Sequence, residues 1–308
     1  MLERHDFNLL DKIADLSYLP ENTAYNIRKN GLSAERKVTE TVDITTKTDK
    51  EGIDIRIKDG TVGETCHIPV IITQSGIEEM VYNDFYIGEG ARVTINAGCG
   101  IHNCGSCDSE HDGIHTFHVG KNAVVTYSEV HYGEGEGEGK RILNPQTILY
   151  LEEGAKVTLE STQIRGVDDT KRYTKAVLKG ENAEFIVQEK LLTHGDQRAD
   201  SIMDVFLDGE NSSCRVISRS VAQDQSTQVF YPRVVGNTAC FGHVQCDSII
   251  MGKAKVRSIP EISCNHVDAG LIHEAAIGKI AGDQILKLQT LGLSYEEAEE
   301  KILEGFLR

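Results

Sequence analysis

The chain of 308 residues has no tryptophan, no excess of basic side chains and no apolar stretch near the roughly 20 residues of a membrane span. Its net charge of -16 disfavours nucleic acid and anionic membranes, because both attract basic surfaces. The first 15 residues carry charges such as Glu3, Arg4 and Asp6, so they are not expected to form a signal peptide. These absences together predict a cytoplasmic protein that binds neither nucleic acid nor membrane.

Several motifs of catalysis are also missing. The acidic turn HYGEGEGEGK, which begins at His131, is not a phosphate-binding loop, because Arg141 follows Lys140 where Ser or Thr is needed. We find no Walker motif and no G-x-S-x-G elbow, so the chain is not expected to hydrolyse ATP itself. In a reducing compartment, its eight cysteines indicate buried thiols, metal ligands or catalytic groups rather than a disulfide scaffold.

A repeated pattern occupies the middle of the chain. Five segments each contain an alternating apolar run, a turn with glycine, a small residue and a second alternating run. The small residues follow one another at intervals of 32, 32, 28 and 29 positions and are Ala91, Ala123, Ala155, Ala183 and Ser212. Such a period favours a mainly β fold, a parallel β-helix of about 30 residues per coil whose stacked copies share one core. An antiparallel sandwich stays open, because strand–turn–strand is also typical of a hairpin.

Both ends of the chain differ from the repeats. Helical spacing covers Leu9 to Lys29, and Asp283 to Leu307 indicates two further helices. Ser294 and Glu297 have the spacing of a capping box for the last helix. These helices either cap the solenoid or dock a partner. Three segments are therefore predicted: a helical segment over 1–37, a β-helix core over 38–280 and a helical segment over 281–308.

A first cluster of potential metal ligands follows the first repeat. Its cysteines have the C-x4-C-x2-C spacing that iron–sulfur ferredoxins also use, and soft thiolates select iron–sulfur clusters, zinc or copper. Its members are Cys99, His102, Cys104, Cys107, His111, His115 and His118. The segment is also polar and rich in glycine, so an elaborated turn with inert thiols is the alternative.

A second cluster lies near the end of the repeats and comprises Cys240, Cys246, Cys264, His266, His273 and Glu274. Cys246 and Glu274 are 28 residues apart, which is one repeat period. Residues one period apart lie in adjacent coils about 4.8 Å from each other, close to the separation of two ligands of one metal. The spacing therefore predicts a thiolate and a carboxylate on one metal, whereas a small buried hydrophobic thiol is the simpler alternative for each cysteine.

Two segments resemble the SufB/SufD family of iron–sulfur cluster assembly scaffolds, in a short SufB-like form. They are HVQCDSIIMG (His243–Gly252) and LIHEAAIGKIAGDQILKLQTLGLSYEEAEEKILEGF (Leu271–Phe306). The resemblance implies a right-handed parallel β-helix and a C-terminal helical pair that docks a SufC-type ABC ATPase. It further implies a scaffold rather than an enzyme, and a homodimer that replaces the SufB–SufD pair. A sulfur donor and recipient apo-proteins would be its other partners.

The resemblance also implies functional roles for five residues. The cysteine of the QCDS segment corresponds to Cys246, and the His-Glu pair of the family corresponds to His273 and Glu274. We expect these three residues to hold the metal. Cys99 and His115 correspond to an upstream cysteine and histidine of SufB, and Cys99 is expected to accept sulfur.

The sequence departs from the family pattern at three positions. Ile272 stands where SufB often has another glutamate, and Cys104 and Cys107 have no counterpart in the family. A thiolate with more labile imidazole and carboxylate ligands would suit a transient iron–sulfur cluster, which we expect to be lost on aerobic purification. The alternatives are a regulatory subunit of an ABC ATPase without a cluster, and a β-helix enzyme acting on polysaccharide. The lack of tryptophan for stacking sugars argues against the enzyme.

Overall fold

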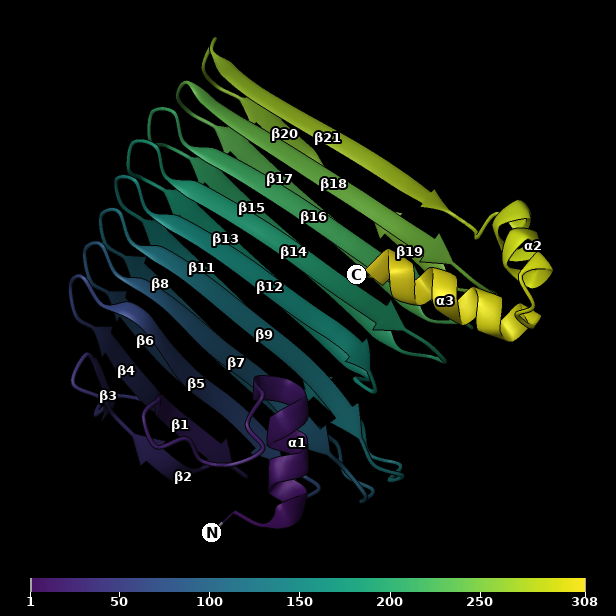
Figure 1. Ribbon diagram of the computed structural model, residues 1–308, viewed down its shortest axis with the longest axis horizontal. Helices are drawn as coiled ribbons and strands as arrows, with labels where there is room; N and C mark the ends of the chain where they lie inside the picture. The colour runs from purple at the N-terminus through teal and green to yellow at the C-terminus, as the bar shows by residue number, and fades with distance from the viewer. Residues whose placement is uncertain (1, 308) are drawn as a thin grey trace.

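Two long β-sheets face each other and enclose one elongated core in the computed structural model, which describes residues 2–307 without the side chain of Arg165 (Figure 1). Consecutive strands of the repeats lie alternately in the two sheets. The first sheet has the order β2 (Leu32–Lys37), β1 (Ala24–Lys29), β5 (Val62–Ile72), β7 (Arg92–His102), β9 (Val124–Glu134), β12 (Lys156–Arg165), β14 (Glu184–Thr193), β16 (Ser213–Ala222), β18 (Cys240–Ile250) and β21 (Ala269–Gly278). The second has the order β19 (Lys255–Ser258), β17 (Thr227–Gly236), β15 (Arg198–Leu207), β13 (Asp169–Leu178), β10 (Arg141–Leu143), β8 (Ser109–Val119), β6 (Glu78–Ile87), β4 (Gly52–Ile57) and β3 (Val42–Thr46), with β11 (Gln146–Leu151) beside β13 and β8, and β20 (Glu261–Cys264) beside β17.

Strands of neighbouring coils pair in parallel. Val93 of β7 pairs with Val125 of β9, and Phe185 of β14 pairs with Cys214 of β16, so the registers follow the 32- and 29-residue intervals of the sequence. Among residues 2–307, antiparallel pairing joins only β1 to β2 and β3 to β4, near the N-terminal end. The predicted parallel β-helix is confirmed, and the antiparallel sandwich is excluded.

The repeated small residue lies at an inner corner of each coil. All five of these side chains are fully buried. The residue before each of them has a positive φ between 55° and 66°, a conformation that Gly and Asn tolerate best. These preceding residues are Gly90, Asn122, Gly154, Asn182 and Asn211. The turn signal in the sequence therefore reflects a sharp corner with no room for a larger inward side chain.

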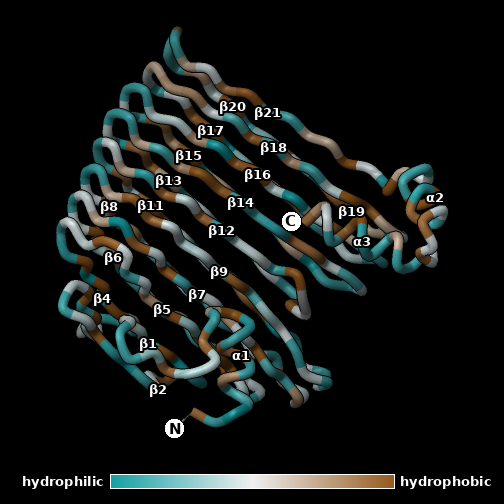
Figure 2. Tube along the Cα trace, viewed as in Figure 1, coloured by the Kyte–Doolittle hydropathy of each residue, from teal (hydrophilic) through white to brown (hydrophobic). Residues whose placement is uncertain are grey.

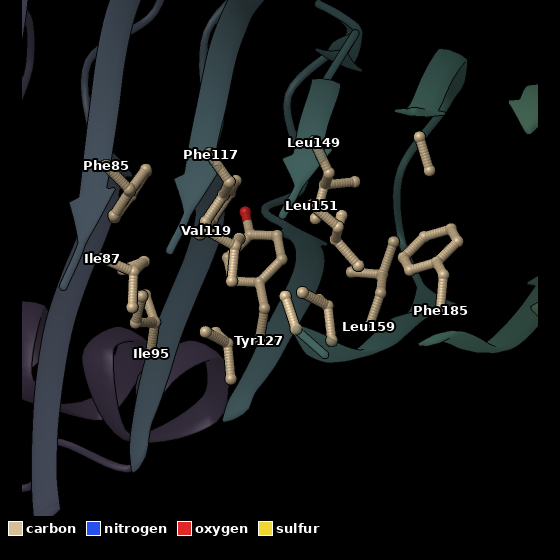
Figure 3. Packing of buried hydrophobic residues seen from close by; sticks show 14 of the residues in the cluster. Phe85, Ile87, Ile95, Phe117, Val119, Tyr127, Leu149, Leu151, Leu159 and Phe185 are labelled. Atoms are coloured by element: carbon tan, nitrogen blue, oxygen red, sulfur yellow. The ribbon is translucent and has the colours of Figure 1, made fainter. Parts of the chain in front are cut away.

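The interior is mainly apolar, because hydrophobic and polar residues alternate along the strands (Figure 2). Phe85 and Phe117, on adjacent strands of the second sheet, stack with ring centroids 4.2 Å apart, and Tyr127 of the first sheet packs against Phe117 (Figure 3). Aliphatic side chains continue this packing from coil to coil. Burial of this apolar surface is the main force that holds the two sheets together.

The N-terminal helix is shorter than predicted. Helix α1 (Arg4–Ala14) ends where Asp15 adopts a left-handed conformation with φ of 51°. The helical spacing predicted as far as Lys29 is wrong beyond this point, since β1 and β2 follow. Tyr25 and Ile27 of β1 pack in the cluster beneath α1, and β1 pairs with β5. Sheet pairing thus overrides the local periodicity.

Helix α1 lies across the outer face of the first sheet (Figure 1). The sheet has glycine at the contact: a Cβ added to Gly98 would lie 2.2 Å from the Ile13 carbonyl oxygen, and one added to Gly100 would lie 2.8 Å from the Leu9 side chain. This close approach fixes the helix over the ends of β7 and β9.

Two helices follow the solenoid, as predicted. They are α2 (Gly282–Thr290) and α3 (Tyr295–Leu307). The capping box is present: the Ser294 backbone N–H donates to Glu297 Oε2 at 2.8 Å, and the Glu297 N–H donates to Ser294 Oγ at 3.1 Å. No helix within the described residues is long and apolar enough to cross a membrane.

Candidate functional site

Cys246 and His273 meet inside the last coils of the solenoid. They lie on the adjacent strands β18 and β21, and Cys246 Sγ is 3.3 Å from His273 Nε2. Cys246 is 3 % exposed and faces the core. A cavity of about 20 Å³ touches its side chain and is lined by polar groups that include Ser218 and Glu189. The pair therefore offers a sulfur and a nitrogen ligand next to a small polar space, large enough for roughly one water.

The strand register separates Glu274 from this pair. Cys246 pairs with Ala275, and Glu274 pairs with Gln245, so the step between coils is 29 residues here. The inference that a 28-residue step brings Glu274 beside Cys246 is wrong, because a shift of one residue turns a side chain to the other face of the sheet. Glu274 instead lies outside, with its Oε2 3.6 Å from His243 Nε2. Within residues 2–307, Cys246, His273 and Glu274 do not bring three ligand atoms within 4.8 Å of one another.

Burial keeps the Cys246 thiol protonated. Loss of solvent raises its pKa to about 12, and the nearby carboxylates of Glu189 and Asp247 act in the same direction. Burial also lowers the pKa of His273, with a further contribution from His243. The imidazole nitrogen is thus unprotonated at neutral pH, and a metal ion would have to displace the proton of the thiol.

Cys99 lies on the inner face of β7 in a different environment. His131 of β9 is its register partner, and both side chains are at least nine-tenths buried. Burial opposes ionisation of the thiol, but interaction with His111 and His131 outweighs it and lowers the pKa of Cys99 to about 7. His111 Nδ1 lies 3.0 Å from Glu79 Oε1. Cys99 therefore has substantial thiolate character at neutral pH.

His115 lies on the same strand as His111 but has other partners. Its Nδ1 is 2.6 Å from the Tyr127 hydroxyl, and its Nε2 is 3.1 Å from Asn83 Nδ2. Burial lowers the pKa of His115 to about 4, so the ring is neutral. His111 and His131, rather than the predicted His115, are the imidazoles that act on the Cys99 thiol.

A row of buried polar side chains continues from Cys99 towards Cys246. Arg172 of β13 donates to His131 Nδ1 at 2.9 Å and to Glu189 Oε1 at 2.8 Å. Glu189 of β14 also accepts hydrogen bonds from Ser201 and Ser218, each at 2.8 Å. Ser218 is the register partner of Cys246. A buried charge is costly unless it is paired, and here each charge has partners. The row thus connects the two cysteines through the interior.

Residues 72–306 match the family model described as SUF system FeS cluster assembly, SufBD core domain. The chain belongs to the SufBD family. Curated relatives include an iron-sulfur cluster assembly SufBD family protein of Methanocaldococcus jannaschii, 26 % identical over 242 residues, which are 78 % of this chain and 75 % of the relative. A homolog from Methanothermobacter thermautotrophicus strain Winter is 27 % identical over 244 residues, and a chloroplastic protein of Arabidopsis thaliana is 29 % identical over 230 residues. These alignments cover 77 % and 71 % of this chain, but only 57 % and 41 % of the relatives' own length.

Membership of the SufBD family supports a role in iron–sulfur cluster assembly and confirms the resemblance found in the sequence. The structure adds buried polar residues that no motif in the sequence marks, chiefly Glu129, Arg172 and Glu189. Strand parity could have found them. Counting in twos from the buried Ala183 leads to Phe185, Val187 and then Glu189, all facing inward.

Proposed function

We propose that this SufBD family protein is a scaffold on which an iron–sulfur cluster is assembled, with the cluster as cargo rather than as a resident cofactor. The observation that carries the proposal is the Cys246–His273 pair, with a sulfur and an imidazole nitrogen 3.3 Å apart beside the polar interior. Thiolate and imidazole are ligands that suit iron. Glu274 lies on the same strand as His273 but is exposed. It becomes a further ligand when a second copy of the chain binds at this edge of the sheet.

Cys99 is the residue that we propose accepts sulfur. A thiolate attacks the terminal sulfur of a donor persulfide, the new S–S bond forms on Cys99, and the donor cysteine leaves as a thiolate. The lowered pKa of Cys99 supports this role, since the thiolate is the nucleophile. His111 Nε2 has no hydrogen-bond partner within the described residues, and His131 Nε2 lies 3.5 Å from Glu129 Oε1. Both imidazoles act on the Cys99 thiol and would stabilise a sulfur added to it. His115 then acts as a neutral neighbour that positions Tyr127.

The open edge of the first sheet supports a homodimer. β21 is the last strand of this sheet, pairs with β18 on one side and leaves its other edge without a strand in the part of the chain that the structure describes. Ile272 and Ile277 on this strand are 46 % and 41 % exposed. Unprotected edge strands pair readily with another strand, and a two-fold axis would pair β21 with its copy. Such a dimer would bring together two copies of His273 and Glu274.

The C-terminal helices support docking of a SufC-type ABC ATPase. Leu286, Leu291 and Tyr295 of this region are 61 %, 72 % and 52 % exposed. An apolar surface of this kind is typical of an interaction site. We propose that the scaffold works in the cytoplasm with this ATPase, a sulfur donor and recipient apo-proteins, and that it catalyses no reaction itself. The eight free cysteines fit a reducing compartment.

Anaerobic reconstitution of the purified complex with iron and sulfide tests the proposal. We expect the Cys246→Ala and His273→Ala variants to lose most of the cluster absorbance and Mössbauer signal, because each removes one member of the ligand pair. Glu274→Ala should lose a smaller part, since Glu274 lies outside the pair. The matched control is Cys264→Ala, which removes an exposed cysteine of the same region.

Two outcomes would count against the proposal in different ways. A full cluster signal in Cys246→Ala would refute the ligand assignment. A complex that forms with the ATPase but takes up no iron at any stage would favour the regulatory subunit without a cluster. Mixed dimers, with Cys246→Ala in one copy and Glu274→Ala in the other, contain no intact chain, so a cluster signal that they retain would mean that the site combines ligands from two chains.

A further inference from the structure

A second group of potential metal ligands lies outside the solenoid, where α1 meets the ends of β7 and β9. His102 and Glu134 are the last residues of these two strands and are register partners. His5, in the first turn of α1, lies with its ring edge-on to His102, at a centroid distance of 4.5 Å. One ligand atom from each of the three residues lies within 4.8 Å of the others. Within residues 2–307, this is the only group of three or more His, Cys, Asp and Glu side chains that comes so close.

The carboxylate of this group is already oriented. Glu134 Oε2 accepts hydrogen bonds from Lys12 Nζ at 2.7 Å and from the Tyr132 hydroxyl at 2.9 Å. Its other oxygen, Oε1, faces His102 Nδ1 at 3.2 Å. The residue therefore offers a carboxylate oxygen directed at a ring nitrogen.

The second ring nitrogen of His102 has its own partner. Cys104 Sγ lies 3.1 Å from His102 Nε2, on the side of the ring away from Glu134. The turn that carries Cys104 is fixed by the fully buried Asn103, whose side chain bonds the Cys107 carbonyl at 2.8 Å and the Gly105 N–H at 3.0 Å. A contact at the second nitrogen of a metal-binding histidine fixes the orientation of its ring, and Cys104 is placed to do this for His102.

The glycines of the acidic turn explain why this corner is so closely packed. The Gly137 N–H donates to the Asn103 carbonyl at 3.1 Å, and a Cβ on Gly137 would lie 2.3 Å from the Gly105 carbonyl oxygen. Gly135 and Gly139 approach the same preceding turn in the same way. The alternation of Gly and Glu thus lets one turn lie directly on the turn of the previous coil, and it holds Glu134 beside His102.

We propose that His5, His102 and Glu134 bind a divalent transition metal, Fe²⁺ or Zn²⁺, that fastens helix α1 to the solenoid. Two histidines with one carboxylate are typical of zinc and non-haem iron sites with open positions for water, whereas Mg²⁺ and Ca²⁺ prefer oxygen ligands alone. The metal would take the position between His102 Nδ1 and Glu134 Oε1. Ligands of one metal are roughly 3–4 Å apart, so the exposed His5 side chain would move closer to the other two when the metal binds.

The site is separate from the proposed cluster site. His102 shares strand parity with Gly98 and Gly100, which face α1 on the outside, whereas Cys99 faces the interior. Nothing in this proposal depends on the role of Cys246. Its test can therefore fail while the proposed function stands, and the reverse also holds.

Metal binding to the full chain provides the test. Cys246→Ala/His273→Ala protein, stripped with a chelator, is dialysed against Zn²⁺ in one arm and anaerobically against Fe²⁺ in the other. We expect about one bound metal per chain and a higher melting temperature in at least one arm, with X-ray absorption showing nitrogen and oxygen ligands. Adding His5→Ala should abolish both the bound metal and the rise in melting temperature. Because His5 is exposed, this change is not expected to disturb folding.

Two further variants sharpen the result. Cys104→Ala should weaken binding by about 10- to 100-fold without removing the site, since Cys104 only positions His102. Glu136→Gln, an exposed acidic residue of the same turn, is the matched control and should bind as before. The proposal is overturned if neither metal binds, or if His5→Ala protein keeps the same stoichiometry and affinity, in which case the two imidazoles merely pack against each other.

Discussion

Cys99 and Cys246 both face the core from the first sheet, two register positions apart along the strands, and differ in charge environment. Both lie on inward-facing positions of the first sheet, and both are less than one-tenth exposed. Interaction with His111 and His131 lowers the pKa of Cys99 to about 7, whereas burial raises that of Cys246 to about 12. The fold buries both side chains and keeps them out of solvent. The side chains that adjacent coils add to this position decide whether the group is a thiolate or a thiol.

This difference fits the two proposed roles. A sulfur acceptor must be nucleophilic before its partner arrives, and Cys99 is ionised by its own neighbours. A cluster ligand can remain protonated until metal arrives, because binding of the metal displaces the proton. Protonation also protects Cys246 from oxidation, since the thiolate is the species that reacts.

The largest expected effect is on the reactivity of the two thiols. At pH 7 about half of Cys99 but only roughly one molecule in 10⁵ of Cys246 is thiolate, given pKa values of about 7 and about 12. Alkylation of the native protein, resolved by peptide mass spectrometry, should therefore level off above pH 7 for Cys99 and keep rising with pH for Cys246. Cys66, a buried thiol whose pKa is also raised to about 12, is the matched control and should follow Cys246. Identical pH profiles for Cys99 and Cys246 would remove the contrast.

The second effect concerns the charged row between the cysteines. Arg172→Met would leave the Glu189 carboxylate buried without its cation, so we expect a loss of about 3–5 kcal/mol in the free energy of unfolding. Urea denaturation measures this loss. Lys156→Met, which breaks an exposed ion pair with Glu184, is the control and should cost about 0–1 kcal/mol. Equal losses in the two variants would mean that the buried pair is no more important than a surface pair.

The smallest effect is on the pKa of Cys99 itself. His111→Gln removes a positive charge beside the thiol, so the pKa of Cys99 should rise by roughly 1–2 units and the thiolate fraction at pH 7 should fall by about 10-fold. The alkylation profile against pH reports this change, and the profile of Cys246 should not move. His118→Gln changes a histidine on the outer face of the same strand and serves as the control. An unchanged Cys99 profile in His111→Gln would assign the lowered pKa to His131 alone.

The sequence by itself favoured the architecture, a parallel solenoid, although it left an antiparallel sandwich open. The intervals between the small corner residues predict the coil, because only a small side chain fits the inner corner and each coil must present one. The capping box of Ser294 and Glu297 was predicted for a similar reason: it is a local interaction between residues three positions apart. Two segments, His243–Gly252 and Leu271–Phe306, were enough to indicate the family. The family resemblance in turn pointed to Cys246 and His273 as candidate ligands.

Tertiary structure decided which side chains meet. The interval between coils varies from 28 to 32 residues, so the sequence could not show that Cys246 pairs with Ala275 and lies beside His273 rather than Glu274. A strand alternates its faces at every residue, so an uncertainty of one position in register reverses the contact. His111 and His115 face the same side of β8, so strand parity could not decide between them, and only the packing of the two sheets shows that His111 acts on Cys99. The pKa of each thiol depends on charges from several coils, and those distances exist only once the coils are stacked.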